Sequence, residues 1–255
     1  MCVIFVHGNR LEYDEVTTSV WDMYRCLTMG RDDAPPLRFV AWSWPSDKRR
    51  GILNDVRAKA SRTESDGYYL GWFLSQLPED RPLRLVGYSF GARVVTGASH
   101  LLGGGKLSGR TLSNVVMTEQ DQPVASRPRV VLMAAATHSH WLRPGSYHER
   151  ALHRIGSLLN IYNGSDRILK RYRAIDRRSQ PEALGYSGMY TADLSNAAER
   201  IEQLNAAGMV GRQHRLANYQ RNGWLRSRIQ SFIYGDPTPA GGDDHGQVDA
   251  AVAAP

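Results

Sequence analysis

The hydrophobic pattern of the chain predicts strands that alternate with helices. Short continuous apolar runs, typical of strands buried on both faces, are separated by stretches with helical spacing. The runs that predict strands are 2–6, 37–44, 83–86, 129–136 and 158–162, with a weaker candidate at 185–191. The stretches that predict helices are 14–28, the end of 46–60, 65–77, 92–102, a basic stretch after residue 166, about 195–206, and 222–234. This order indicates an α/β fold with a mostly parallel sheet of about six strands and helices on both faces.

Two stretches depart from this alternation. Three consecutive glycines, 103–105, end the helical pattern, and the polar stretch 103–128 that they open is long for a plain connection. We interpret 103–128 as a surface insertion or a flap over the site, with a disordered excursion as the alternative. From residue 236 the chain is mostly Pro, Gly, Ala and Asp. We therefore expect one domain over 1–235 and a disordered tail over 236–255.

Composition and charge narrow the class of protein. The chain has 255 residues, of which 42% are hydrophobic, and a formal net charge of +7, so it can bury a large core without disulfides. The basic excess is mostly scattered arginine, which favours a solvated surface and leaves attraction to anionic partners as an alternative. Cys2 and Cys26 have no metal-binding spacing. The chain enters its first strand without signal-peptide features, and no stretch is suited to crossing a membrane. We expect a soluble cytoplasmic protein.

The most informative motif is Gly87-Tyr88-Ser89-Phe90-Gly91, which lies between a predicted strand and a predicted helix. In this context the motif predicts a nucleophile elbow, a sharp turn that lifts the serine oxygen out of the sheet. Gly87 and Gly91 would remove side chains where backbone segments come close together. Ser89 would then lie at the start of the helix, whose free N–H groups favour developing negative charge.

A serine nucleophile needs a base that is oriented by a third group. Such elbows are followed along the chain by an acid and then a histidine. Asp166 follows a buried strand and His214 lies in a late loop before the final helix, so we predict Ser89, Asp166 and His214 as the catalytic residues. The rival acid is Asp193, and the serious rival bases are those that directly follow a strand, His138 and His140. A lone Asp after a strand is otherwise a cap or turn former.

The loop after the first strand supplies the remaining candidates. An oxyanion hole needs preorganised donors, of which the N–H of Phe90 is one and the other should come from this loop. Asn9 is the predicted second donor, with Arg10 as the alternative, and His7 should shape the loop. Tyr88 and Arg10 are the candidate substrate-binding residues. Trp42 and Trp44 share one strand face, where they could line a pocket but more often pack in a core.

Together these motifs resemble the α/β-hydrolase superfamily over about residues 1–235. The resemblance is carried by Val6-His7-Gly8, by the motif around Ser89 and by Asn163-Gly164-Ser165-Asp166. More narrowly, the chain resembles a bacterial α/β-hydrolase family of unknown function, which combines an early Val-His-Gly loop, a tryptophan-containing strand ending near Pro-Ser and a late His. The superfamily sheet usually begins with one or two strands for which this chain has no residues, which implies either a small version of the fold or a natural chain that starts earlier than this sequence.

The resemblance implies a serine hydrolase, similar to esterases, thioesterases and lipases, that cleaves a carboxylic ester or thioester through an acyl-enzyme. The substrate would be a small ester or acyl compound. No cofactor and no metal is implied, since His138 and His140, without a carboxylate or cysteine partner nearby in the sequence, are weak evidence for a metal site. One alternative is a catalytically silent hydrolase fold that serves as a binding module. Another is a binder of nucleic acid or anionic surfaces, although no aromatic and basic reading surface is present and we expect no nucleic acid partner.

Overall fold

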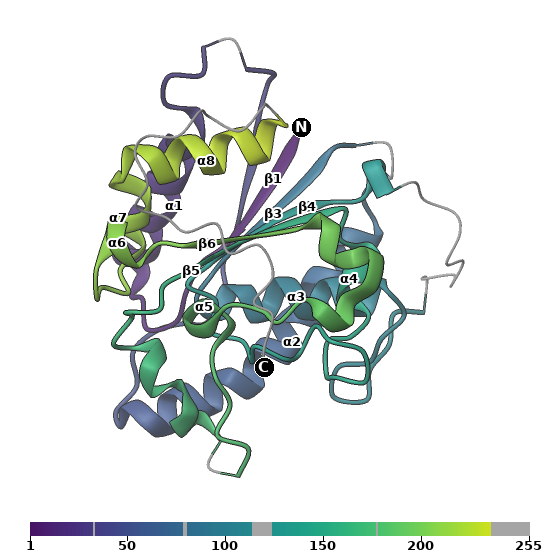
Figure 1. Ribbon diagram of the computed structural model, residues 1–255, viewed down its shortest axis with the longest axis vertical. Helices are drawn as coiled ribbons and strands as arrows, with labels where there is room; N and C mark the ends of the chain where they lie inside the picture. Colours follow the sequence, from purple (N-terminus) through teal and green to yellow (C-terminus); the bar gives the residue numbers. More distant parts are fainter. Residues whose placement is uncertain (33, 79–80, 114–123, 177, 236–255) are drawn as a thin grey trace.

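The computed structural model describes residues 1–32, 34–78, 81–113, 124–176 and 178–235. It contains one sheet of six strands with helices on both faces (Figure 1). The strands are β1 (Cys2–Val6), β2 (Arg38–Trp42), β3 (Leu83–Tyr88), β4 (Arg129–Met133), β5 (Ser157–Tyr162) and β6 (Ile201–Asn205). Their order is β2-β1-β3-β4-β5-β6, and every neighbouring pair is parallel. The carboxyl ends of all six strands therefore meet at one edge, where α/β sheets bind ligands.

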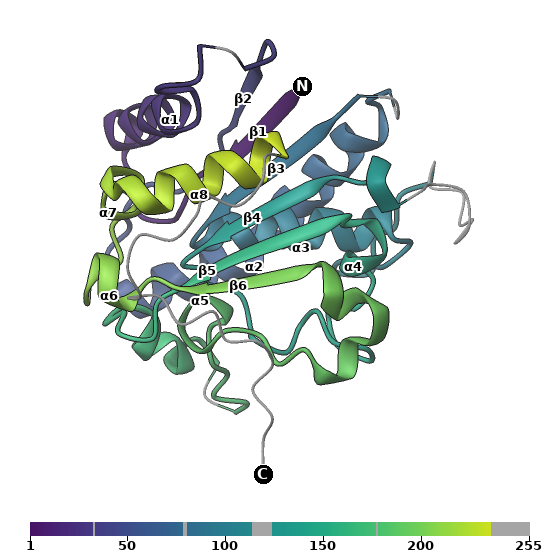
Figure 2. The ribbon, with the colours of Figure 1, turned by 45° about the horizontal axis from the view of Figure 1, so that its top comes forward.

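The helices form two layers around this sheet. One face is covered by α1 (Tyr13–Thr28), α7 (Leu216–Arg221) and α8 (Gly223–Tyr234), and the other by α2 (Ile52–Ser75), α3 (Phe90–Leu102) and α4 (Ala151–Arg154) (Figure 2). The shorter elements are η1 (Val124–Ser126), η2 (Leu169–Ile175), α5 (Leu184–Ser187), η3 (Ala192–Arg200) and α6 (Ala207–Val210). Because both faces of the central strands are covered, β1, β3 and β4 read as continuous apolar runs. This confirms the predicted α/β-hydrolase fold in a small version.

The last strand was assigned wrongly from the sequence. We expected a strand at 185–191 and a helix at about 195–206, but α5 covers 184–187 and the sixth strand, β6, occupies 201–205. In β6 the apolar side chains Ile201 and Leu204 are three apart, which is helical spacing. Pairing with β5 decides the conformation instead, since Ile201 aligns with Leu158 and Leu204 with Ile161.

A second difference concerns the helix before β3. The sequence predicts a helix only at the end of 46–60 and a clearer one at 65–77, whereas α2 runs without a break from 52 to 75. Gly67 and Gly71 lie inside it and allow close approach to α3: a Cβ on either would lie 3.4 Å from a main-chain oxygen, of Val94 or Ala98. Packing against α3 therefore outweighs the helix-weakening effect of glycine.

The predicted insertion is described only in part. Leu107 and Leu112, which follow the glycine run, are buried against Leu101 of α3. Residues 114–123 lie outside the described residues, as does the predicted tail, 236–255. The flap and the disordered tail thus stay predictions. Among the described residues, no helix combines the length and the apolar character needed to cross a bilayer.

Candidate active site

The residues around Ser89 adopt the geometry of a nucleophile elbow. Ser89 lies between β3 and α3 with φ 52° and ψ −118°, a conformation that non-glycine residues rarely adopt. A Cβ on Gly87 would lie 2.8 Å from the Cα of Ala92, and one on Gly91 would overlap the carbonyl oxygen of Val6. The strained turn therefore requires both glycines, as predicted, and it raises Ser89 at the carboxyl edge of the sheet.

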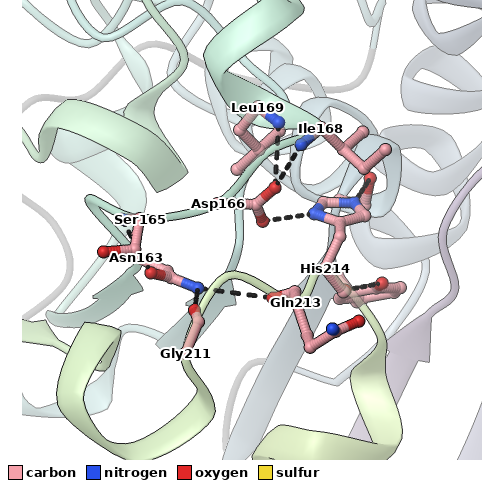
Figure 3. Close-up of polar contacts among 10 residues, drawn as sticks. Asn163, Ser165, Asp166, Ile168, Leu169, Gly211, Gln213 and His214 are labelled. Atoms are coloured by element: carbon pink, nitrogen blue, oxygen red, sulfur yellow. Dashed lines mark hydrogen bonds and ion pairs between the residues drawn. The ribbon is translucent and has the colours of Figure 1, made fainter.

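Three side chains that are far apart in the sequence form one hydrogen-bonded chain at this edge. The Nε2 atom of His214 lies 3.0 Å from the Oγ of Ser89, and its Nδ1 atom lies 2.6 Å from the Oδ2 of Asp166 (Figure 3). A carboxylate only accepts, so the Nδ1–H of His214 donates to Asp166 and Nε2 is free to accept from the serine hydroxyl. The structure thus brings the three predicted residues together, with His214 between Ser89 on one side and Asp166 on the other.

Both oxygens of the buried Asp166 carboxylate are occupied. Oδ1 accepts hydrogen bonds from the main-chain N–H groups of Ile168 (2.8 Å) and Leu169 (2.9 Å), while Oδ2 faces His214. Asp166 therefore also caps the helical turn that follows it, which is the ordinary role of an Asp at such a position. These cap hydrogen bonds fix the orientation of the carboxylate toward His214. Arg167, the next residue, is exposed and forms no ion pair among the described residues.

Two side chains hold the backbone of the histidine loop. The hydroxyl of Tyr88 donates a hydrogen bond to the carbonyl oxygen of His214, and the two rings are 5.5 Å apart. On the acid side, the Nδ2 of Asn163 donates to the carbonyl oxygens of Gly211 (2.8 Å) and Gln213 (3.3 Å) (Figure 3). Asn163 is completely buried and its Oδ1 accepts from the N–H of Ser165. The elbow strand and the acid strand thus both fasten the loop that carries His214.

The contacts of Tyr88 revise our expectation for that residue. We predicted Tyr88 as a substrate-binding residue, but its hydroxyl is used within the protein and its side chain is buried. Burial raises the pKa of Tyr88 above its usual value, so the hydroxyl keeps its proton and remains a donor. Asn163 was overlooked as a functional candidate, although its position directly after a buried strand and before the acid could have indicated it.

The loop after β1 packs against the elbow. A Cβ on Gly8 would lie 2.8 Å from the ring of Tyr88 and 3.3 Å from the Cβ of Ser89. His7 is buried, which lowers its pKa, and the neutral ring donates from Nδ1 to the carbonyl of Gly8 (2.9 Å) and stacks on Trp44. Trp44 in turn donates from Nε1 to the carbonyl of His7 (2.9 Å). His7 shapes this loop, as expected, and Trp44 is part of its support.

Two backbone donors are available at the junction of these loops. Phe90 is the first residue of α3, so its N–H has no acceptor within the helix. The N–H of Asn9 makes no hydrogen bond within the described part of the chain. The register of β1 with β3 aligns Val6 with Gly87, which places the segments that carry these two residues side by side. The arrangement fits the two predicted oxyanion donors.

Arg10, the other predicted substrate-binding residue, belongs to a buried ionic cluster. Its guanidinium pairs with the carboxylate of Asp55, which is also 2.9 Å from the Nζ of Lys59. Burial alone would raise the pKa of Asp55, but the hydrogen bonds from Lys59 and Arg10 outweigh it and keep that pKa below its usual value. Lys59 also donates to the carbonyl oxygens of Ser46 and Asp47. The cluster ties the loop after β1 and the loop after β2 to α2.

The rival acid and bases have other partners. Asp193 is exposed and pairs with Arg143. The Nδ1 of His138 lies 2.9 Å from the hydroxyl of Tyr172, which accepts from the buried guanidinium of Arg93 at the same distance. His138 also stacks on Trp141 with ring centroids 4.2 Å apart, and the ring of His140 is 5.6 Å from that of His138. Neither histidine contacts Ser89 through a hydrogen bond among the described residues.

Comparisons with known proteins give remote structural likenesses. No protein-family model matches the chain, and no curated protein matches its sequence. It is similar to the catalytic core domain of acetyl xylan esterase from Trichoderma reesei, with 15% identity over 56% of this chain and just under two thirds, 66%, of that one, at a TM-score of 0.34. A cutinase-like protein from Cryptococcus sp. gives 11% identity, coverage of 93% and 97%, and a TM-score of 0.40.

A third solved structure, Zea mays acyl-protein thioesterase 2, gives 15% identity, coverage of 79% and 82%, and a TM-score of 0.38. Scores this low carry no functional argument. The narrower resemblance to a bacterial family of unknown function stays a prediction. The chain nevertheless has the α/β-hydrolase fold, because it combines the six-stranded parallel sheet with an elbow between β3 and α3.

Proposed function

We propose that this protein is a serine hydrolase that cleaves a carboxylic ester or thioester through an acyl-enzyme. The single observation that carries the proposal is the hydrogen-bonded chain from Ser89 through His214 to Asp166, with distances of 3.0 Å and 2.6 Å, at a strained elbow. A serine hydroxyl within hydrogen-bond reach of an oriented imidazole is what nucleophilic catalysis needs.

Each side chain then has one role in acyl transfer. The Oγ of Ser89 attacks the carbonyl carbon while the Nε2 of His214 takes its proton. Asp166 fixes the imidazole tautomer and stabilises the imidazolium. The N–H groups of Phe90 and Asn9 stabilise the oxyanion. His214 returns the proton to the departing alcohol or thiol, which leaves the acyl group on Ser89. Water then attacks the acyl-enzyme with His214 again taking the proton, and the return of that proton to Ser89 releases the carboxylic acid.

The proposal is tested by labelling and hydrolysis together. A fluorophosphonate should add one adduct to the intact protein, mapped by mass spectrometry to Ser89, and Ser89→Ala should abolish both the adduct and the hydrolysis of a nitrophenyl ester. A panel of such esters with increasing acyl length would then define the acyl pocket. A protein that neither labels nor hydrolyses any ester of the panel would instead be the catalytically silent binding module.

A further inference from the structure

Exposed basic side chains surround the candidate active site. They lie on three segments: Arg49 and Arg50 before α2, Arg167, Lys170 and Arg171 after β5, and Arg212 and Arg215 on either side of His214. We call segments 49–53, 167–171 and 212–215 the basic rim. Among the described residues, none of these seven cations forms an ion pair, whereas some cations elsewhere do, such as Arg143 with Asp193 and Arg228 with Glu202.

One hydrogen bond joins two of these segments directly, and others connect the elements that carry them. The N–H of Arg167 lies 3.4 Å from the carbonyl oxygen of Arg212, which connects the acid loop to the histidine loop. Arg57 of α2 donates to the carbonyl oxygens of Ala174 (2.8 Å) and Ile175 (3.3 Å) at the end of η2. Figure 1 shows the start of α2 and the α6–α7 end of the chain on the same side of the molecule. The cations therefore belong to one face, the one that carries Ser89.

The same face exposes large apolar side chains. Ile52 and Leu53, at the start of α2, are 66% and 48% exposed, and Ile168, next to the acid loop, is 58% exposed. Ile168 lies between Arg167 and Lys170 in the sequence, and Ile52 and Leu53 closely follow Arg49 and Arg50. Neighbouring like charges repel one another, and exposed apolar side chains are poorly hydrated. Both unfavourable effects are reduced when the face contacts a surface with anionic head groups above an apolar layer.

We propose that the basic rim docks on an anionic lipid surface and that the substrate ester is presented to Ser89 from that surface. The cations would contact the lipid phosphates, while Ile52, Leu53 and Ile168 enter the boundary between head groups and acyl chains. The apolar side chains favour a lipid surface over a nucleic acid, because phosphodiester backbones offer them no apolar layer. The substrate part of this inference rests on the proposed hydrolase function, and the docking part does not.

The test measures binding of the full chain to vesicles of phosphatidylglycerol mixed with phosphatidylcholine. Wild-type protein should sediment with them and not with phosphatidylcholine alone. Combining Arg50→Gln, Lys170→Gln and Arg171→Gln should lower the partition coefficient about 100-fold, given the contribution of each cation near an anionic membrane. A matched control removes three exposed cations outside the basic rim, Arg81→Gln, Lys106→Gln and Arg110→Gln, and should bind almost as wild type.

A second variant tests the apolar part. Ile52→Ser with Leu53→Ser should weaken vesicle binding about tenfold and leave retention on duplex DNA unchanged. The proposal is overturned if wild type does not prefer the anionic vesicles or if the rim and control triples lose binding equally. It is also overturned if the Ile52 and Leu53 changes leave vesicle binding intact, which would indicate a general polyanion face.

Activity separates this inference from the proposed function. The rim triple should hydrolyse a soluble nitrophenyl ester at the wild-type rate and lose activity only on an ester embedded in anionic vesicles. Ser89→Ala should bind vesicles as wild type does. Vesicle binding without any hydrolysis would therefore refute the hydrolase and keep the docking surface.

Discussion

The hydroxyl of Tyr88 donates a hydrogen bond to the main-chain carbonyl oxygen of His214. Tyr88 directly precedes the proposed nucleophile, Ser89, and it holds in place the backbone of the proposed base, His214. Tyr88→Phe removes this bond and keeps the buried ring. We expect kcat for ester hydrolysis to fall about five- to tenfold with little change in KM, since one net hydrogen bond positions the base. Tyr234→Phe is the control, because it removes a bond to the carbonyl of Leu27 far from the site. Equal activity losses in both variants would contradict the positioning role.

Asn163 and Asn160 allow a matched comparison on the acid side. Both are completely buried, Asn160 within β5 and Asn163 directly after it, but Asn160 donates to Gln203 (3.2 Å), whereas Asn163 donates to the histidine loop. Asn163→Ala and Asn160→Ala should both lower the unfolding midpoint, because each removes a completely buried side chain together with its hydrogen bonds. Only Asn163→Ala should also lower kcat, by about tenfold or more. Hydrogen exchange at 211–214 should rise in that variant alone.

The three proposed catalytic residues should act as a unit. Ser89→Ala and His214→Ala should each remove most of the hydrolysis, by about 10⁴-fold or more, and the double variant should be little worse than either. Asp166→Asn leaves the wrong imidazole tautomer favoured and should lose a comparable factor. Kinetics with one nitrophenyl ester measure all four. Additive losses, or an unaffected His214→Ala with an inactive His138→Ala, would show that the base is misassigned.

The elbow glycines should not tolerate a methyl group. In Gly91→Ala the new Cβ would overlap the carbonyl oxygen of Val6, so we expect a loss of about 3 kcal/mol or more in unfolding free energy, or no folded protein. Gly223→Ala is the matched control, because the nearest atom to its Cβ is 4.0 Å away at the tip of Arg226. Denaturant unfolding should place that variant within about 1 kcal/mol of wild type.

Buried histidines should make the protein sensitive to acid. Burial, with Arg93 and His140 nearby, lowers the pKa of His138 from 6.5 to about 3 despite the opposing charge of Asp176. Between about pH 6.5 and pH 3, the unfolded chain therefore binds a proton at His138 that the folded protein does not bind. This contribution of His138 to the free energy of unfolding is complete above about pH 6.5 and is lost progressively as the pH falls toward about 3. His7 and His148, whose pKa values burial also lowers, add to the slope. His138→Gln should flatten the dependence of the urea midpoint on pH, and His153→Gln, at an exposed histidine of α4, should leave it unchanged.

The sequence by itself determined the central part of the fold. Strands β1, β3, β4 and β5 are largely buried on both faces, so their sequences are dominated by apolar residues, interrupted by Arg84 in β3 and Asn160 in β5, and can be recognised without a partner. The elbow was equally clear, because its motif lies between an apolar run and a helical pattern, although the atom that excludes a side chain at Gly91 is the carbonyl oxygen of Val6 on β1. The order of Ser89, Asp166 and His214 along the chain then selected three residues that the structure brings within hydrogen-bond distance.

Only the tertiary structure decided the features that depend on a neighbour. Strand β6 is an edge strand with helical apolar spacing, and its hydrogen bonds with β5 set its conformation. Whether Tyr88 points to a substrate or to the protein depends on where the histidine loop folds, 126 residues later in the chain. Asn163 and Asp55 are single polar residues with partners far away in the sequence, which are the histidine loop for Asn163 and Arg10 for Asp55. Their roles arise from long-range hydrogen bonds and ion pairs, which leave no periodic signal in a sequence.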